Sequence, residues 1–422
     1  MLGKPDNLFQ PNHLAFRLSH RAIPGFVSWL IISTIVCLLS SVGIGCSTVP
    51  TRDDSPVQKV WQGAVAKGFS GGAIVVSRTK TLLFETRNSS QSPSLVIHPS
   101  TPLPLCSVTK AMTAEIVFDL IDAGKLSLDG TLKSYLPWIP SFAENITIRQ
   151  LLTHTSGLRN MDKAMSDGTN GVSKIYLTFD ESWQPLKARI SGIIGDQVAA
   201  PAGTKYDYNN TDFLMLQAIL EHASRQTFEE LLSDHVFTPA GMRHSHLAPW
   251  SSAKASFVDC YEVDSGKETK LDRFNMAIYG GAAGAISTPE DLVNWMKFML
   301  VHPSGRQILM SGSQFGGFQG FGGYAYRSSF VQKKHSVSGD EVVYERPGAV
   351  NGYTLQVSFL PDRGVAVAAF SNRAGEKLGS VFEGSGLVAD LVTAACASSL
   401  PSTQAPGADI KSGAAIQRAT RR

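Results

Sequence analysis

The chain has 422 residues, and its 38 Lys and Arg against 35 Asp and Glu give a formal net charge of +3. This near balance argues against a basic nucleic-acid-binding protein and against an acidic disordered chain, so we expect no nucleic-acid partner. Hydrophobic residues make up 43% of the chain, enough for a sizeable core, while five cysteines are too few for a disulfide-stapled scaffold or a zinc ribbon.

The first fifty residues have the layout of an export signal. Basic residues precede an uncharged stretch, 22–51, which contains the densely apolar run 26–39. A segment of small residues follows this run and ends at Cys46. Residues 1–50 therefore resemble a bacterial lipoprotein signal with Cys46 as the lipidated residue, although Gly43 stands where such signals prefer Leu. The alternative is an uncleaved transmembrane anchor, since about 20 apolar residues span a bilayer. Both interpretations predict a membrane-anchored domain outside the cytoplasm, in the bacterial cell envelope.

The remaining elements follow in the order strand hairpin, helical middle, strand run and final helix. Residues 51–60 are predicted to be a short polar linker, and the apolar runs 71–77 and 81–85 predict a hairpin. Helical periodicity and capping patterns predict helices over 107–124, 146–153, 211–224, 227–235 and 289–300. Later strands are expected at 319–327, 334–337, 342–344, 353–359 and 365–370, followed by a helix over 380–396.

This order predicts one antiparallel sheet to which both ends of the domain contribute, with a helical region inserted. We expect the domain to occupy 51–399, with its helical lobe at roughly 125–280. The Pro/Ala/Ser/Gly-rich segment 400–422 is predicted to be a disordered tail.

The strongest chemical signal is Ser107-Val-Thr-Lys110 at the start of a predicted helix. The spacing i, i+3 places the hydroxyl and the amine on one helix face, within hydrogen-bond reach. A serine hydroxyl is a poor nucleophile until a base removes its proton, and an amine whose pKa is lowered by burial can serve. By itself this pattern also fits a capping serine followed by a surface lysine.

Two further segments strengthen the signal. Tyr208-Asn-Asn210 precedes a predicted helix and offers a phenol for proton transfer and an amide for a substrate carbonyl. The segment Tyr344-Glu-Arg346-Pro-Gly348 lies at the start of the late strand run.

With these segments the chain resembles serine β-lactamase-like hydrolases of the class C type. That family includes class C β-lactamases, D-alanyl-D-alanine carboxypeptidases and β-lactamase-like esterases. The resemblance runs from about residue 68 to residue 372. It is carried in order by 104–110, 126–132, 148–158, 208–210, 237–242, 280–292, 359–364 and 371–372.

The resemblance implies the fold and the roles of the site residues. The fold is α/β (α+β type), with an antiparallel sheet flanked by helices and an inserted all-helical lobe. Ser107 would be acylated, Lys110 and Tyr208 would share proton transfer, and Asn210 would orient the substrate. The backbone N–H groups of Ser107 and Ala349 would form the oxyanion hole. No metal or organic cofactor is implied.

One departure from the family pattern concerns the third motif, which is usually Lys-Thr-Gly or His-x-Gly. Here the matching residues are Arg346, Pro347 and Gly348. Arg346 keeps a cation that can bind a carboxylate, which makes it and Gly348 candidate substrate-binding residues. Pro347 lacks an N–H and is awkward in a central strand. The departure puts β-lactam hydrolysis in question and leaves open a catalytically inactive member.

Other reactive residues receive structural interpretations. Ser70 lies in a G-x-S-x-G sequence, but a strand-like run follows it where a nucleophile elbow needs a helix. His154 sits in a Thr-His-Thr-Ser-Gly segment that in the family is structural. His244 and His246 have no acidic or cysteine neighbours to complete a metal site and are expected at the surface.

Three cysteines follow the export signal, namely Cys106, Cys260 and Cys396. They allow one disulfide at most, and we expect free buried thiols, with Cys106 packing beside Ser107 rather than reacting.

These observations predict a cell-envelope serine hydrolase that cleaves a small-molecule or peptide ester or amide through an acyl-enzyme on Ser107. An esterase fits the altered third motif, whereas a D-amino-acid peptidase fits the location and Arg346. A true class C-like β-lactamase and an inactive binding protein with the same fold are the alternatives.

Overall fold

The computed structural model describes residues 54–87, 97–166, 185–250, 256–264, 267–272, 274–302, 325–327, 330–334, 342–381 and 383–398. All of them belong to one compact unit, Asp54–Arg422. The predicted export signal, Cys46 and the predicted tail lie outside these residues. Within the described ranges, no helix has both the length and the apolar character needed to cross a bilayer.

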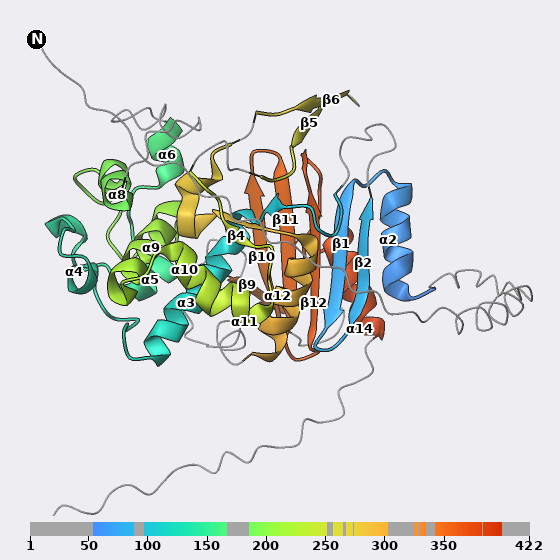
Figure 1. The fold of residues 1–422 in the computed structure, drawn as a ribbon, viewed down its shortest axis with the longest axis horizontal. Helices are drawn as coiled ribbons and strands as arrows, with labels where there is room; N and C mark the ends of the chain where they lie inside the picture. The colour runs from blue at the N-terminus through green and yellow to red at the C-terminus, as the bar shows by residue number, and fades with distance from the viewer. Residues whose placement is uncertain are drawn as a thin grey trace, which may run out of the picture. The chain divides into compact units, whose positions relative to one another are not determined.

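The centre of this unit is a seven-stranded antiparallel sheet, drawn in blue and orange in Figure 1. Its strand order is β2-β1-β12-β11-β10-β9-β8, so the N-terminal hairpin pairs with the last long strand. The strands are β1 Gly71–Ser77, β2 Thr81–Arg87, β8 Ala325–Arg327, β9 Phe330–Lys334, β10 Val342–Val350, β11 Tyr353–Leu360 and β12 Val365–Ser371. The predicted sheet made by both ends of the domain is confirmed.

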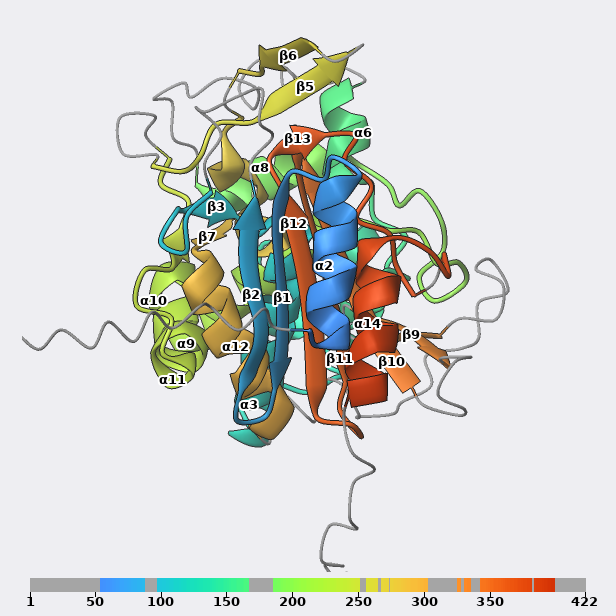
Figure 2. The same cartoon turned by 90° about the vertical axis from the view of Figure 1, so that its right-hand side faces the viewer.

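Helices cover both faces of the sheet. Side chains of a strand alternate between its faces, and in β1 and β12 both sets are apolar and buried. Ile74 and Phe370 pack toward the helical lobe, whereas Val75 and Val367 pack toward the terminal helices α2 (Pro56–Ala66) and α14 (Leu387–Ser398). Figure 2 looks onto α2 and α14 where they lie side by side over the sheet.

The predicted polar linker at 51–60 was wrong, because its second half, 56–60, belongs to α2. Ser55 caps this helix through a hydrogen bond from the Gln58 N–H to its side chain, and Pro56 occupies the first turn, where its missing N–H costs no hydrogen bond. Val57 and Trp61, four residues apart, are buried on the face that meets the sheet.

The inserted region forms the helical lobe beside the other face of the sheet (Figure 1). Its helices are α3 Thr109–Asp122, α4 Leu132–Tyr135, α5 Ile148–Leu152, α6 Met161–Ser166, α8 Leu186–Ile194, α9 Asn210–Ser224, α10 Phe228–Leu232, α11 Thr238–Ala240 and α12 Pro289–Val301, with a π-helical turn η5 at Ser233–Phe237 and 3₁₀ turns η3 at Ser141–Ala143 and η7 at Met276–Ala282. α3 and α9 are buried over most of their length and form the centre of the lobe.

Two features of the fold differ from the sequence predictions. The helix expected over 380–396 begins only at Leu387, because Gly379, Gly384 and Gly386 adopt positive φ angles that end helical geometry. Two small sheets were not predicted. One contains β3 (Leu103–Pro104), β7 (Ala285–Ser287) and β4 (His246–Leu247), and the other contains β13 (Arg373–Ala374), β5 (Tyr261–Asp264) and β6 (Lys267–Lys270).

Candidate active site

Ser107 lies in a tight turn that joins the small sheet to α3. The turn η2 (Cys106–Val108) precedes α3 directly, and Cys106 has a positive φ of 49°, which is unusual for a residue with a side chain. The Thr109 hydroxyl donates to the Cys106 carbonyl at 2.7 Å and accepts from the Ala285 N–H at 3.1 Å. These bonds hold the Ser107 turn against the strand β7.

Two side chains that can transfer a proton donate hydrogen bonds to the hydroxyl of Ser107. The Tyr208 hydroxyl donates to Ser107 Oγ at 2.8 Å, and Lys110 Nζ donates to the same oxygen at 3.3 Å. The structure thus brings together three residues that are separated by up to 101 positions in the sequence. A base within hydrogen-bond reach of a serine is the geometry that nucleophilic activation requires.

Lys110 is fully buried, and its ammonium is surrounded by acceptors. Besides Ser107, Nζ donates to Asn210 Oδ1 at 2.6 Å and to the Ala282 carbonyl at 2.9 Å. Burial lowers the pKa of Lys110 from 10.5 to about 8, with a further contribution from the nearby Arg346 cation. A lysine with this pKa supplies a useful fraction of neutral amine near neutral pH.

Tyr208 is half-buried at the end of the segment before α9. Burial by itself would raise the pKa of this phenol, but the adjacent cations of Arg346 and Lys110 outweigh it and lower the pKa from 10 to about 8. Arg346 Nη2 donates to the Tyr208 hydroxyl at 2.9 Å, and its guanidinium lies 5.5 Å from the ring centre. Tyr208 and Lys110 are therefore both poised to exchange a proton with Ser107.

The altered third motif keeps its cation directed at Ser107. In β10, Arg346 and Gly348 are buried, whereas Pro347 and Ala349 are exposed, as alternation along a strand requires. Arg346 Nε donates to the Ser107 carbonyl at 2.8 Å. Arg346 was predicted as a substrate-binding residue, and in the structure its guanidinium donates to Ser107 and Tyr208 of the protein itself.

Pro347 fits because of its place in the sheet. In the described part of the sheet, β9 pairs with β10 from Val342 to Glu345, and beyond that point β10 pairs with β11. Among the described residues, Pro347 thus lies beyond the last β9 pair and is paired only with Gln356 of β11, the kind of position where a residue without an N–H is tolerated.

Gly348 permits a close approach between β10 and the nucleophile. A Cβ atom at this position would lie 2.9 Å from the Leu105 carbonyl oxygen and 3.2 Å from the Ser107 nitrogen. The strand therefore runs directly beside the Ser107 N–H, the first predicted oxyanion donor. The second, the N–H of Ala349, is one residue further along this strand and stays a prediction.

Asn210 is the first residue of α9, and its carboxamide has a defined orientation. Its Oδ1 accepts from Lys110, and its Nδ2 donates to Asp162 Oδ2 at 2.8 Å. Asp162 and the Ala282 carbonyl are two members of the site that the sequence reasoning missed. Ala282 belongs to a glycine-rich segment that matches the family, whereas nothing in the local sequence around Asp162 points to the site.

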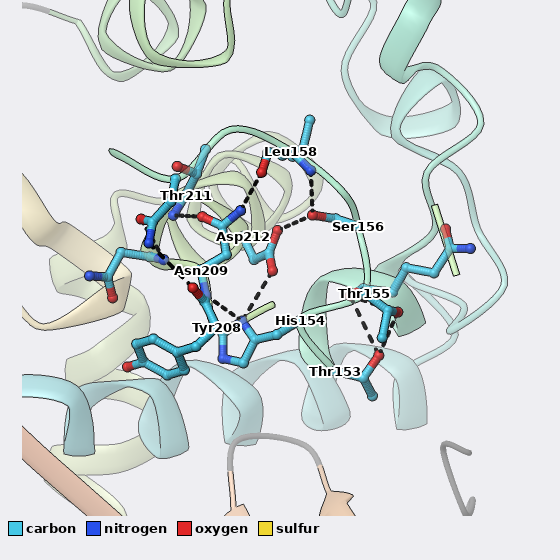
Figure 3. Close-up of polar contacts among 12 residues, drawn as sticks. Thr153, His154, Thr155, Ser156, Leu158, Tyr208, Asn209, Thr211 and Asp212 are labelled. Atoms are coloured by element: carbon cyan, nitrogen blue, oxygen red, sulfur yellow. Dashed lines mark hydrogen bonds and ion pairs between the residues drawn. The ribbon is translucent and has the colours of Figure 1, made fainter. Parts of the chain in front are cut away.

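His154 supports the site from behind rather than entering it. Its buried ring lies 4.6 Å from the Tyr208 ring, and Nδ1 accepts from the Asn209 N–H at 3.2 Å and lies 3.1 Å from Asp212 Oδ2. Ser156 donates to the other oxygen of Asp212, and Figure 3 shows this network beside Tyr208. Burial lowers the pKa of His154 and raises that of Asp212, which favours the neutral form of each group behind the Tyr208 segment.

The remaining reactive residues lie as the structural interpretations predicted. Ser70 is buried at the entrance to β1, where its carbonyl accepts from the Ser371 hydroxyl. Cys106, Cys260 and Cys396 are buried and form no disulfide with one another, and burial raises the pKa of the Cys106 thiol to about 12. No group of three or more potential metal ligands occurs in the described ranges.

The fold consists of a sheet and a helical lobe, and the site brings a Ser-x-x-Lys sequence at the start of a helix into hydrogen-bond contact with a Tyr-x-Asn segment. Together they define a class of two-lobed proteins. The family model for β-lactamase matches residues 57–382, and the chain belongs to this family. The sequence-based recognition and the predicted fold class are confirmed.

The curated proteins that are similar to this chain include a named hydrolase. The D-aminopeptidase of Brucella anthropi is 27% identical over 310 residues, which cover 72% of this chain and 56% of that protein. Protein flp of Staphylococcus aureus is 25% identical over 223 residues, 51% of this chain and 42% of its own length. The chain thus spans about half the length of the curated relatives it matches.

Solved structures share the fold at low sequence identity. EstCE1, described as a hydrolase with promiscuous acyltransferase activity, superposes with a TM-score of 0.65 at 18% identity, covering 80% of this chain and 97% of EstCE1. The D-amino acid amidase of Ochrobactrum anthropi SV3 superposes with a TM-score of 0.63 at 17% identity, covering 81% of this chain and 97% of the amidase.

Proposed function

We propose that the chain is a serine hydrolase that cleaves an ester or amide through an acyl-enzyme on Ser107. The observation that carries this proposal is the convergence of Lys110 and Tyr208 on Ser107 Oγ, with the pKa of each lowered to about 8. A structural serine needs neither partner, and burying a lysine beside it is costly unless the arrangement is used.

The proposed reaction has two acyl-transfer steps. Ser107 Oγ attacks the substrate carbonyl while its proton passes to the Tyr208–Lys110 pair, and the same pair returns that proton to the leaving alcohol or amine as its bond to the acyl carbon breaks. A water molecule then attacks the ester on Ser107, gives its proton to the pair, and releases the acid with the serine restored. The oxyanion is stabilised by the N–H of Ser107 beside Gly348.

In this proposal, the contacts of Arg346 favour an active hydrolase over a catalytically inactive protein with the same fold. Its guanidinium donates to the Tyr208 hydroxyl and to the Ser107 carbonyl, so the altered motif still delivers a positive charge to the proton-transfer pair. A lowered tyrosine pKa serves proton transfer, which a catalytically inactive binding protein does not perform.

Among substrates, we favour D-amino-acid amides and peptides, with simple esters as the second candidate. Relatives named D-aminopeptidase and D-amino acid amidase support the first. The fold likeness to EstCE1 and the altered third motif support the second. Hydrolysis of β-lactams is the third possibility in this order.

We also propose that the protein works at the bacterial cell envelope and is anchored there by its N-terminus. The apolar run 26–39 and the Gly45-Cys46 sequence support either lipidation at Cys46 or an uncleaved anchor.

A hydrolysis panel with the detergent-solubilised full-length chain tests this function. It contains p-nitrophenyl acetate, the p-nitroanilides of D-alanine and L-alanine, and a chromogenic cephalosporin, each with the wild type and with Ser107→Ala. We expect turnover of at least one ester or amide that the variant loses. Equal rates for both proteins on every substrate would defeat the proposal.

A further inference from the structure

Asp162 is an acidic side chain of the helical lobe that belongs to the hydrogen-bond network of Ser107. It lies near the start of α6 and is only partly buried. Its Oδ2 accepts a hydrogen bond from Asn210 Nδ2 at 2.8 Å, and its Oδ1 accepts one from the Tyr279 hydroxyl at 3.0 Å. Asn210 in turn accepts from Lys110, which donates to Ser107. The carboxylate is thus connected to the nucleophile through two side chains.

No Lys or Arg forms an ion pair with this carboxylate in the part of the chain that the structure describes. Its two donors are a neutral amide and a neutral phenol. Lys110 is held one amide away from it by Asn210. Arg346 is engaged with the Ser107 carbonyl and the Tyr208 hydroxyl. Because each carboxylate oxygen can accept two hydrogen bonds, Asp162 keeps acceptor capacity for a further donor.

The position of Asp162 relates to one particular part of an acyl substrate. In the proposed acyl-enzyme the carbonyl oxygen points to the Ser107 N–H, on the side where β10 and Gly348 pass. Asn210 and Asp162 belong to the helical lobe, on α9 and α6, and are joined by a hydrogen bond. In the proposed binding mode, the substituents of the α-carbon, two bonds from the carbonyl carbon, extend from Ser107 toward these two residues. A positively charged α-substituent there would meet the Asp162 carboxylate.

We propose that Asp162 binds the α-ammonium group of the substrate, so that the preferred acyl donor is an amino-acid ester, amide or peptide with a free N-terminal amine. This inference rests on the proposed acyl-enzyme function and specifies its substrate class. Through this contact the enzyme recognises the free amine at the N-terminus of the acyl donor. N-acylated substrates, including penicillins and internal peptide bonds, lack the charge that Asp162 would bind.

The test compares matched esters, because esters are susceptible whichever leaving group the enzyme prefers. The substrates are the methyl esters of D-alanine and L-alanine, each as the free amine and as the N-acetyl derivative, hydrolysed by the full-length chain. The measured quantity is the ratio of kcat/KM for the free amine to that for its N-acetyl partner. We expect a ratio of about 10 to 100, the value of one hydrogen bond to a charged group.

The variant Asp162→Asn is expected to bring this ratio close to one, because the amide keeps the size of the side chain and removes the charge. Tyr279→Phe is the matched control, since it removes a hydrogen bond from the same carboxylate without changing its charge, and it should preserve the ratio. If Asp162 only positions Asn210, Asp162→Asn will lower both rates by the same factor and leave the ratio unchanged, which overturns the inference.

A wild-type ratio near or below one also overturns it. Absence of Ser107-dependent hydrolysis of all four esters would defeat the proposed function itself. Hydrolysis that depends on Ser107 but does not distinguish amine from N-acetyl derivative would defeat the Asp162 inference alone.

Discussion

Replacement of Arg346 by methionine should move the pH dependence of catalysis without removing the nucleophile. The Arg346 cation is the strongest of the influences that lower the pKa of Tyr208, and it also contributes to lowering that of Lys110. Loss of this charge raises the pKa of both groups. Less phenolate and less neutral amine then exist at pH 7, so the activity falls whichever of the two removes the Ser107 proton.

The size of the effect follows from the contact that is lost. Arg346 Nη2 donates to the Tyr208 hydroxyl at 2.9 Å in a partly buried setting, and a hydrogen bond to a charged group is worth about 1.5–3 kcal/mol. At 1.36 kcal/mol per decade this corresponds to about one to two pH units. The ascending limb of kcat/KM should therefore move from a midpoint near 8 to higher pH, and activity at pH 7 should fall about 10- to 100-fold.

The assay is the pH profile of kcat/KM for p-nitrophenyl acetate, with Ser107→Ala as the blank for spontaneous hydrolysis. Arg346→Lys keeps a cation and should shift the profile less. A thermal unfolding curve checks that Arg346→Met is folded, because the substitution also leaves the Ser107 carbonyl without its donor. If Arg346→Met lowers the maximum of kcat/KM but leaves the midpoint of its pH profile unchanged, the reasoning is refuted. Arg346 would then be assigned to substrate binding.

Three further predictions concern groups around the site. Burial raises the pKa of the Glu115 carboxyl in the folded state well above its ordinary value of 4.5. Protonated Glu115 therefore adds its full contribution to the stability of the fold below pH 4.5, and this contribution is lost as the pH rises through the pKa of the folded state. Glu115→Gln should therefore gain stability over the wild type progressively from pH 5 to pH 8 in thermal unfolding, and parallel curves would contradict this. Gly348→Ala should lower kcat about 10²- to 10³-fold, because the new Cβ forces β10 away from the Ser107 N–H. Gly63→Ala, where a Cβ meets nothing within 4 Å, is its control and should keep wild-type kcat. Equal kcat for these two variants would show that the close approach is unimportant. Trp61→Ala should destabilise the chain by about 3–5 kcal/mol in denaturant unfolding and leave kcat of the folded fraction unchanged, because this side chain is 5% exposed between α2 and the sheet. A loss under 1 kcal/mol would mean that α2 is not part of the cooperative unit.

The parts of the fold that the sequence predicted correctly are those with local causes. The hairpin of β1 and β2 has two apolar runs around a polar turn, and α12 begins at a Thr-Pro-Glu sequence that caps it. The Ser107–Lys110 contact also has a local cause, since one helical turn brings the two side chains together.

The missed helix α2 shows how a usable signal was overlooked. The Ser55-Pro56 start and the apolar positions Val57 and Trp61 are helix signals, but they stand in a polar segment that follows the export signal. The burial of those two residues depends on α14, which lies more than 300 positions later. The final helix was placed too early because apolar residues before Leu387 hid the glycines that break it.

Most of the site depends on contacts that local patterns do not encode. Tyr208 and Asn210 were assigned through the family resemblance, because their contacts with Ser107 and Lys110 span about a hundred positions. Asp162 matches no family motif noted in the sequence, and its role emerges only when α6 is packed against α9. The orientation of Arg346 likewise required the pairing of β10, which shows how Pro347 is accommodated.

The most direct test of the central claim is covalent labelling of the full-length chain with a fluorophosphonate, followed by intact-mass measurement and peptide mapping. We expect one adduct, on Ser107, that Ser107→Ala abolishes, and faster labelling at pH 8 than at pH 6 because the pKa values of Lys110 and Tyr208 lie at about 8. A folded wild-type chain that takes no label, or a Ser107→Ala chain that labels equally well, would contradict it.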